Sequence, residues 1–228
     1  MLFRSPRANM KRTIILRGRQ FTVDEDESCI HQLFWDEVEN GHWESYTFDA
    51  VGKYLSAGGV LLDVGAWLGA VSLYAAAGGA QCHAIEPDPV AYEMFWRNVR
   101  ANPEFKIVAS TGAIADRLGI LRLGSVDGLG SSMTSVHSEM DCFDVPCCTL
   151  SDLARNMQRV DMVKIDAEGA EALVLADVAF FESFRPTVLI TLHPHLEPCD
   201  LGPISKLYGP IEQVAPDTYI LEGRSWTS

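Results

Sequence analysis

Two carboxylates and a histidine form the strongest candidate for chemistry in this sequence. Asp166 and Glu168 follow the mostly apolar run at residues 162–165 and are one residue apart, so both side chains can face one pocket. His193 follows a second apolar run, residues 186–192, and its ordinary pKa near neutrality suits a general base. The same side chains could instead bind Mg²⁺ or Mn²⁺ through oxygen and imidazole ligands. Of these two readings the sequence favours proton removal, by His193 or Asp166, although a histidine at a strand end can also be structural.

A second group of residues is typical of a site for an adenosine ligand. Asp63 lies in the apolar run 60–64, which leads through Gly65 and Gly69 into Ala- and Leu-rich sequence. This pattern predicts a buried strand, a tight turn and a helix, with Gly65 leaving room for a ligand and Gly69 letting the helix approach the strand. Glu86 ends the next apolar run, where a carboxylate can accept both hydroxyls of a ribose.

Either a nicotinamide dinucleotide or S-adenosylmethionine would fit such a site. The dinucleotide fingerprint G-x-G-x-x-G is not matched, because only Gly65 and Gly69 are present. Asp63 beside the turn would repel a pyrophosphate, whereas a carboxylate suits the cationic sulfonium. The residues therefore favour S-adenosylmethionine.

Composition limits the partners and the setting. The net charge of −13 argues against a nucleic-acid-binding surface. No apolar run reaches the roughly 18 residues that span a bilayer, and the basic N-terminus lacks the apolar core of a secretory signal. The six cysteines are scattered in a way that fits neither a zinc site nor a disulfide framework. We expect a cytoplasmic protein with reduced cysteines and no membrane partner.

The elements that must position these residues alternate between strands and helices. Over residues 44–228 this alternation predicts one α/β domain with a mostly parallel sheet. Helices are expected at residues 70–77, at 149–157 and from 171 through 178. Residues 1–43 predict a cap: a frayed segment 1–12, a β-hairpin within residues 13–23 and a helix that Ser28 begins.

Other residues are expected near the ligand. Glu44 lies in the break between the helix that Ser28 begins and a second helix predicted at residues 46–55, and it would line the mouth of the site. Asp88, followed by a proline, is expected to cap a helix and is also a cofactor candidate next to Glu86. Ala113 follows the third predicted strand, where an adenine would lie. The Gly- and Ser-rich residues 124–135 predict either a mobile substrate loop or a plain surface loop.

Three segments resemble the FkbM-type S-adenosylmethionine-dependent methyltransferases. They are residues 61–66 (LLDVGA), 84–88 (AIEPD) and 163–171 (VKIDAEGAE), of which the last is the most specific. The similarity covers roughly residues 44–222. It implies the class I methyltransferase fold, with a seven-stranded sheet of order 3-2-1-4-5-7-6 and an antiparallel last strand. It also implies O-methylation of a hydroxyl, often on a sugar or a secondary metabolite.

The resemblance also implies roles for individual positions. Glu86 would hold the ribose, and Asp166 and Glu168 would face the methyl-transfer site. Trp67 occupies a position where many relatives carry Asn, and Thr191 one where an acid is frequent. The residues that would hold the methionine end of the cofactor are Asp63, Gly65 and Ala66.

The sequence therefore predicts an S-adenosylmethionine-dependent methyltransferase that acts on a small-molecule hydroxyl. The positions taken as cofactor-binding also include Trp67, Gly69 and Asp166. Two alternatives stay open: a nicotinamide-dependent oxidoreductase, and a cofactor-binding protein without catalysis. The oligomeric state is not determined by the sequence.

Overall fold

A seven-stranded sheet forms the centre of the molecule. The structure is a computed structural model that describes residues 10–25, 29–125 and 127–224. From one edge to the other the strands are β5 (Lys106–Thr111), β4 (Gln81–Glu86), β3 (Val60–Val64), β10 (Met162–Ile165), β11 (Thr187–Thr191), β13 (Thr218–Leu221) and β12 (Ile211–Ala215). The direction of β13 is opposite to that of the other six strands, so β13 pairs antiparallel with both β11 and β12 and the remaining pairs are parallel. The predicted α/β class with a mostly parallel sheet is confirmed.

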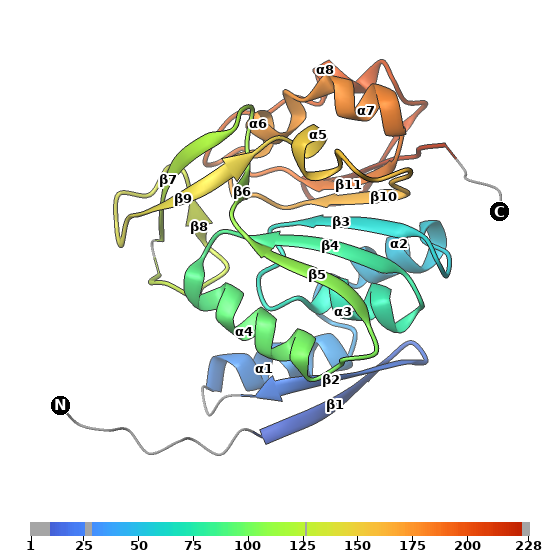
Figure 1. Cartoon of the computed structure of the whole chain (residues 1–228), viewed down its shortest axis with the longest axis vertical. Coiled ribbons are helices and arrows are strands. Elements are labelled where there is room, and N and C mark those ends of the chain that lie inside the picture. Colours follow the sequence, from blue (N-terminus) through green and yellow to red (C-terminus); the bar gives the residue numbers. More distant parts are fainter. Residues whose placement is uncertain (1–9, 26–28, 126, 225–228) are drawn as a thin grey trace.

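Helices cover both faces of this sheet, which explains why its central strands are mostly apolar. Every residue of β3 and β10 is buried, as expected for parallel strands that are covered on both sides. In Figure 1, α2 (Ser45–Tyr54), α3 (Ala70–Ala77) and α4 (Pro89–Arg100) lie on one face. The other face carries α5 (Leu150–Leu153), α6 (Glu171–Leu175), α7 (Val178–Phe184) and α8 (Gly202–Ser205). Two separate groups of buried apolar side chains fill the two layers.

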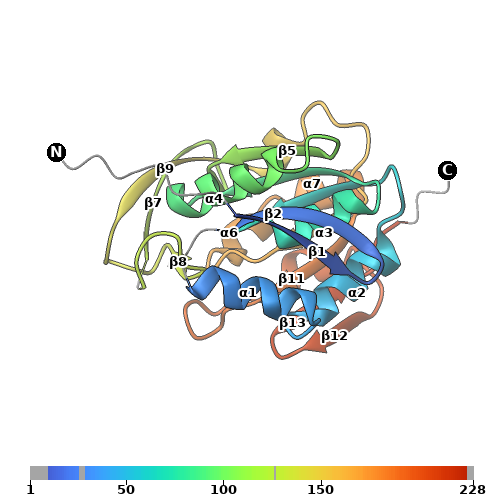
Figure 2. The same ribbon diagram turned by 90° about the horizontal axis from the view of Figure 1, so that it is seen from below.

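The N-terminal part packs on the helix layer. Strands β1 (Met10–Leu16) and β2 (Arg19–Glu25) form the predicted antiparallel hairpin, and α1 (Cys29–Glu39) follows it. Seen from below, the hairpin lies in front of α3 (Figure 2), and β2 contacts both α3 and α4. Asn98 of α4 and Asn102, just after this helix, hydrogen-bond to the backbone of β2. The hairpin therefore covers helices instead of the sheet itself.

The hairpin is longer than the sequence suggested. Residues 10–12 were expected to be frayed, and this was wrong for Met10–Arg12, which pair with β2. Arg12 forms ion pairs with Glu25 of β2 and with Asp36 and Glu39 of α1, and these contacts hold the start of β1 in place. The predicted capping residue Ser28 and residues 1–9 lie outside the described residues.

A second, smaller sheet stands beside the main one. Its strands are β6 (Ala113–Ile114), β9 (Phe143–Cys148), β7 (Gly119–Ser125) and β8 (Thr134–Ser135), in that order. It arises from the segment between β5 and α5 (Figure 1), and its Gly130 and Thr134 hydrogen-bond to Asp88, which follows β4. Within the described part of the chain, we find no helix with the length and apolar character needed to cross a membrane.

Candidate functional site

A cavity of about 330 Å³ opens at the carboxyl ends of the central strands. This is the edge at which open α/β sheets bind ligands, because the loops that follow the strands converge there. The turn after β3, the end of β4 and the segments after β10 and β11 all contribute to its wall. The predicted site residues that line it are Glu44, Gly65, Ala66, Trp67, Glu86, Ala113, Asp166, Glu168 and His193. Three predicted cofactor residues are not part of the lining: Asp63, Gly69 and Asp88.

Glu86 is held in a fixed position at the end of β4. Its carboxylate accepts hydrogen bonds from the backbone N–H of Trp67 at 2.7 Å and of Asp88 at 2.8 Å. Burial raises the pKa of Glu86 to about 7. A carboxylate with both oxygens anchored and one side open to the cavity is suited to accept a pair of ligand hydroxyls.

Trp67 connects this carboxylate to the wall of the cavity. Its φ of 46° is in the left-handed region, which a large side chain rarely adopts. The conformation turns its N–H toward Glu86, and the indole Nε1 donates to the carbonyl oxygen of Gly130 at 3.0 Å. The ring also packs edge-on against Phe34 of α1. Trp67 thus closes one side of the cavity.

Asp63 lies behind the cavity and is fully buried. It accepts a hydrogen bond from the hydroxyl of Ser72 at 2.7 Å, and the ammonium group of Lys164 lies 3.8 Å from its other oxygen. Burial raises the pKa of Asp63. Burial alone would lower the pKa of Lys164, but the charges of Asp166, Asp63 and Glu44 outweigh it and raise that pKa. The pair is therefore a buried ion pair beneath the site.

Lys164 also links the buried Asp63 to residues at the cavity surface. Its ammonium group lies 3.2 Å from Asp166 Oδ2 and donates to the carbonyl oxygen of Gly65 at 2.7 Å. One side chain therefore links the buried Asp63, the turn after β3 and the carboxylate after β10. Asp63 is connected to the cavity through Lys164 and does not itself line it.

The two glycines of the turn after β3, Gly65 and Gly69, allow neighbouring segments of the protein to pack closely. Gly65 has a φ of 74°, and a side chain there would overlap with the carbonyl oxygen of Asp166. The space we expected for a ligand is thus occupied by the loop after β10. A side chain at Gly69 would overlap with the ring of Phe95, so this glycine allows approach to α4, where we had expected approach to the strand. The backbone N–H groups of Gly65 and Ala66 both donate to the carbonyl oxygen of Ile85.

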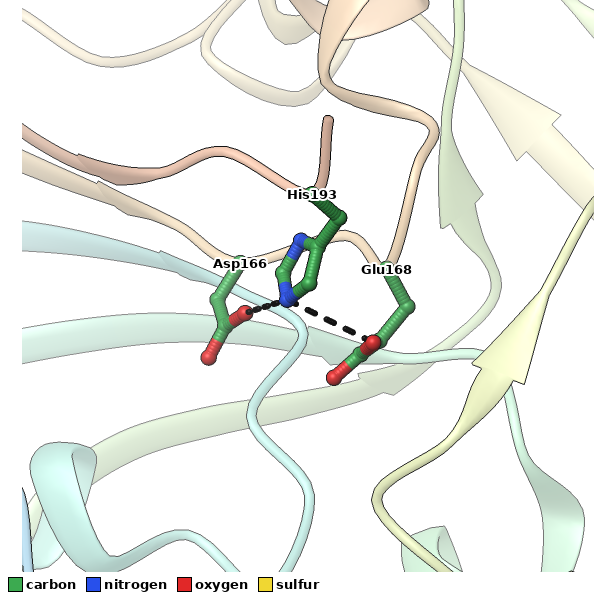
Figure 3. A group of neighbouring side chains, drawn as sticks. All are labelled: Asp166, Glu168 and His193. Atoms are coloured by element: carbon green, nitrogen blue, oxygen red, sulfur yellow. Dashed lines mark ion pairs between the residues drawn. The ribbon is translucent and has the colours of Figure 1, made fainter. Parts of the chain in front are cut away.

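Asp166, Glu168 and His193 meet in the cavity (Figure 3). The Nε2 atom of His193 lies 3.7 Å from Asp166 Oδ1 and 3.4 Å from Glu168 Oε2. Burial raises the pKa of Glu168 to about 7, although the nearby His193 favours its charged form. Glu168 Oε2 is buried and accepts no hydrogen bond from any described residue. The arrangement offers an imidazole nitrogen between two carboxylates, open to a ligand.

The opposite nitrogen of the imidazole has a partner that the sequence did not assign. His193 Nδ1 lies 2.8 Å from Oε1 of Glu171, whose side chain is fully buried. Burial of His193 opposes protonation, but the hydrogen bond to Glu171 and the neighbouring carboxylates outweigh this effect and raise the pKa of His193.

The same three side chains have a geometry that a cation could use. Their ligand atoms lie within 4.8 Å of one another, and no second group of this kind occurs among residues 10–25, 29–125 and 127–224. Lys164 already places a positive charge 3.2 Å from Asp166. A divalent cation would have to share that carboxylate with the lysine, which weakens the case for a metal.

Asp88 does not line the cavity but holds a loop that does. As predicted, it is the N-cap of α4 and accepts hydrogen bonds from the N–H groups of Val90 and Ala91. Its second oxygen accepts from the N–H of Gly130 and the hydroxyl of Thr134. Ser131, Ser132 and Thr134 line the cavity, so the Gly- and Ser-rich segment does contribute to the site.

Replacement of Asp88 by alanine is expected to lower the free energy of unfolding by about 2 kcal/mol, from the lost N-cap and the two lost loop contacts. Urea denaturation of the purified variant measures this. Asp88→Asn is the matched control, since its amide oxygen can still cap the helix, and it should lose less than half as much. A loss below about 0.5 kcal/mol in the alanine variant would show that Asp88 does not hold the loop.

Sequence reasoning missed Lys164 and Glu171 as functional residues. Lys164 is the one charged residue inside the buried strand β10, and a buried charge requires a partner. That signal could have indicated that Lys164 pairs with a carboxylate, although not with which one. Nothing in the sequence indicated the contact of Glu171 with His193.

Comparisons with known proteins give a family and several fold neighbours. A family model described as "Methyltransferase FkbM domain" matches residues 63–201, well over half of the chain. A search of curated proteins found no match. A T. thermophilus 16S rRNA methyltransferase, solved with AdoMet and guanosine, aligns with a TM-score of 0.49 and 15% identity, over 96% of this chain and 52% of that one. Aeropyrum pernix fibrillarin with bound S-adenosyl-L-methionine aligns with a TM-score of 0.47 and 14% identity, over 92% of this chain and 81% of that one. The chain thus spans about half the length of the first of these structures.

Proposed function

Since the chain belongs to the FkbM methyltransferase family, we propose that it transfers the methyl group of S-adenosylmethionine to a hydroxyl oxygen of a small-molecule acceptor. The observation that carries the proposal is the imidazole of His193, whose Nε2 atom faces the cavity between Asp166 and Glu168. A hydroxyl must lose its proton as it is methylated, and a histidine beside carboxylates is suited to receive it.

The residues of the cavity fit the cofactor. S-adenosylmethionine carries its reactive methyl group on a positively charged sulfur. Four carboxylates line the cavity, and its lysine is already paired with Asp63 and Asp166. This acidic wall suits a cation. The four carboxylates are those of Glu44, Glu86, Asp166 and Glu168.

We assign parts of the cofactor to parts of the wall. Glu86 would accept the ribose hydroxyls, Ala113 would lie beside the adenine, and the turn at Gly65 and Ala66 would hold the methionine end. The main sheet supports this placement: numbered within that sheet, its strands read 3-2-1-4-5-7-6, the order that the resemblance implies for class I methyltransferases. Asp63 would contribute through Lys164.

His193 is assigned as the general base. It would receive the acceptor's proton at Nε2 while Asp166 and Glu168 stabilise the imidazolium that forms. Alignment of the acceptor oxygen with the methyl group would supply most of the remaining rate enhancement. Asp166, held by Lys164, would keep its position throughout.

The charge of the protein supports a small acceptor. A net charge of −13 and an acidic cavity disfavour a polyanion such as RNA or DNA. A neutral polyhydroxyl compound such as a sugar, or a hydroxylated secondary metabolite, meets no such repulsion. A cytoplasmic location and the absence of a nucleic-acid partner stay predictions.

The test uses S-adenosylmethionine with a labelled methyl group. We expect transfer of the label to at least one hydroxyl compound in pools of sugars and phenols, with an O-methyl signal in the NMR spectrum of the product. Transfer to RNA or to amino groups alone would contradict the proposal. Cofactor binding without transfer to any pool would instead favour the non-catalytic reading.

A further inference from the structure

Glu171 is a fully buried carboxylate beside the cavity, and the reaction proposed above leaves it without a role. Its exposed fraction is 0%, and it lies in the first turn of α6. Its oxygens accept hydrogen bonds from the N–H of Ala167 at 3.1 Å and of Gly169 at 3.1 and 3.2 Å. Two backbone donors therefore fix the carboxylate before it meets any other side chain.

The remaining partner of this fixed carboxylate is His193. Oε1 of Glu171 lies 2.8 Å from Nδ1 of the imidazole. A carboxylate accepts hydrogen bonds, so the proton of this contact belongs to Nδ1. In a neutral imidazole with a proton on Nδ1, Nε2 carries the free lone pair. Nε2 is the nitrogen that faces Asp166 and Glu168 at the cavity.

We propose that Glu171 is a positioning residue for methyl transfer, which holds the proton of neutral His193 on Nδ1 and leaves Nε2 free to take the proton of the acceptor. This inference rests on the proposed function. As the acceptor oxygen bonds to the methyl carbon, its O–H bond breaks and the proton moves to Nε2. The carbon–sulfur bond breaks with its electron pair left on sulfur, and the imidazolium then returns the proton to solvent.

The charges around the ring make this arrangement sensitive to pH. Glu171 stabilises the imidazolium at Nδ1, and Glu168 and Asp166 do so at Nε2. Lys164 lies behind Asp166 and acts in the opposite direction. The rate of methyl transfer should rise with pH, because the base form of His193 exists above its pKa. Other titratable groups near this cluster are His195, whose ring is 5.9 Å from that of His193, Cys199, which interacts electrostatically with Glu171, and Glu44, which interacts with Asp166.

The experiment is ¹⁵N NMR of the histidine rings across a pH series, with the His193 signals assigned by their loss in His193→Gln. In the wild-type protein the neutral ring should carry its proton on Nδ1, with a pKa above the ordinary value. In Glu171→Gln the pKa should fall by about 1–3 pH units and the Nε2-protonated form should appear. Glu197→Gln is the matched control: this partly exposed carboxylate lies near His137 and should leave His193 unchanged.

Activity gives the second readout. The midpoint of the pH–rate profile should shift in Glu171→Gln by the same amount as the NMR pKa, with the affinity for S-adenosylhomocysteine unchanged. A wild-type ring protonated on Nε2, or an unchanged tautomer and pKa in Glu171→Gln, would overturn the role of Glu171. The expected NMR result without transfer to any acceptor would overturn the proposed function and leave the contact with His193 standing.

Discussion

Replacing His193 with alanine is expected to lower the turnover number of methyl transfer about 10²–10⁴-fold, the usual contribution of a general base. The reason is that the acceptor hydroxyl loses the nitrogen that takes its proton. The affinity for S-adenosylhomocysteine should stay within a factor of about three, because Glu86 and the turn after β3, not His193, are assigned to the cofactor. Initial rates at saturating cofactor, together with calorimetric titration, measure the two effects.

His195 offers a matched control for this substitution. It is exposed, stands two residues further along the same segment and does not line the cavity. His195→Ala should retain the wild-type turnover number. If His193→Ala also retained it, the base would have to be another group, with Glu168 the next candidate because its pKa of about 7 also suits proton transfer.

Replacing Lys164 with methionine is expected to lower the free energy of unfolding by about 3–5 kcal/mol, the usual effect of removing one partner from a buried ion pair. Asp63 would then be a fully buried carboxylate with Ser72 as its remaining side-chain partner. Gly65 and Asp166 would lose their contacts with the ammonium group as well. Urea denaturation at neutral pH gives the value, with Lys206→Met as the control at an exposed lysine.

A double variant separates charge from packing at this position. Asp63→Asn combined with Lys164→Met removes both charges, so it should be more stable than Lys164→Met alone. A loss of less than about 1 kcal/mol in Lys164→Met would mean that Asp63 is neutral in the native protein and that the lysine is not its counter-ion.

Much of the fold was predictable because apolar runs and caps are local signals. The helix expected at residues 70–77 is α3, with the same bounds. The helix expected at 149–157 is much shorter: the capping box of Thr149 and Asp152 begins α5, and the chain leaves the helix at Ala154. The helix expected from 171 through 178 is two helices, α6 and α7. The side chain of Asp177 accepts a hydrogen bond from the N–H of Phe180 and so begins α7 as a separate helix.

The site was predictable to the extent that strand ends define it. His193, Asp166 and Glu168 meet because β10 and β11 are adjacent parallel strands that end at one edge. The contacts of Lys164 and Glu171 depend on the pairing register and on how a loop folds back, which spacing along the sequence does not contain. The close packing of Gly65 against the loop after β10 was missed for the same reason.

The most direct test of the central claim is thermal unfolding of the purified protein with S-adenosylhomocysteine, S-adenosylmethionine and NADH in parallel. A ligand at 100 times its dissociation constant adds about 2.7 kcal/mol of stability, which for a chain of this size raises the midpoint by roughly 5–10 °C. We predict this rise with both sulfur ligands, its loss in Glu86→Ala, and no rise with NADH. A rise with NADH alone, or an undiminished response to S-adenosylhomocysteine in Glu86→Ala, would contradict the account of the site.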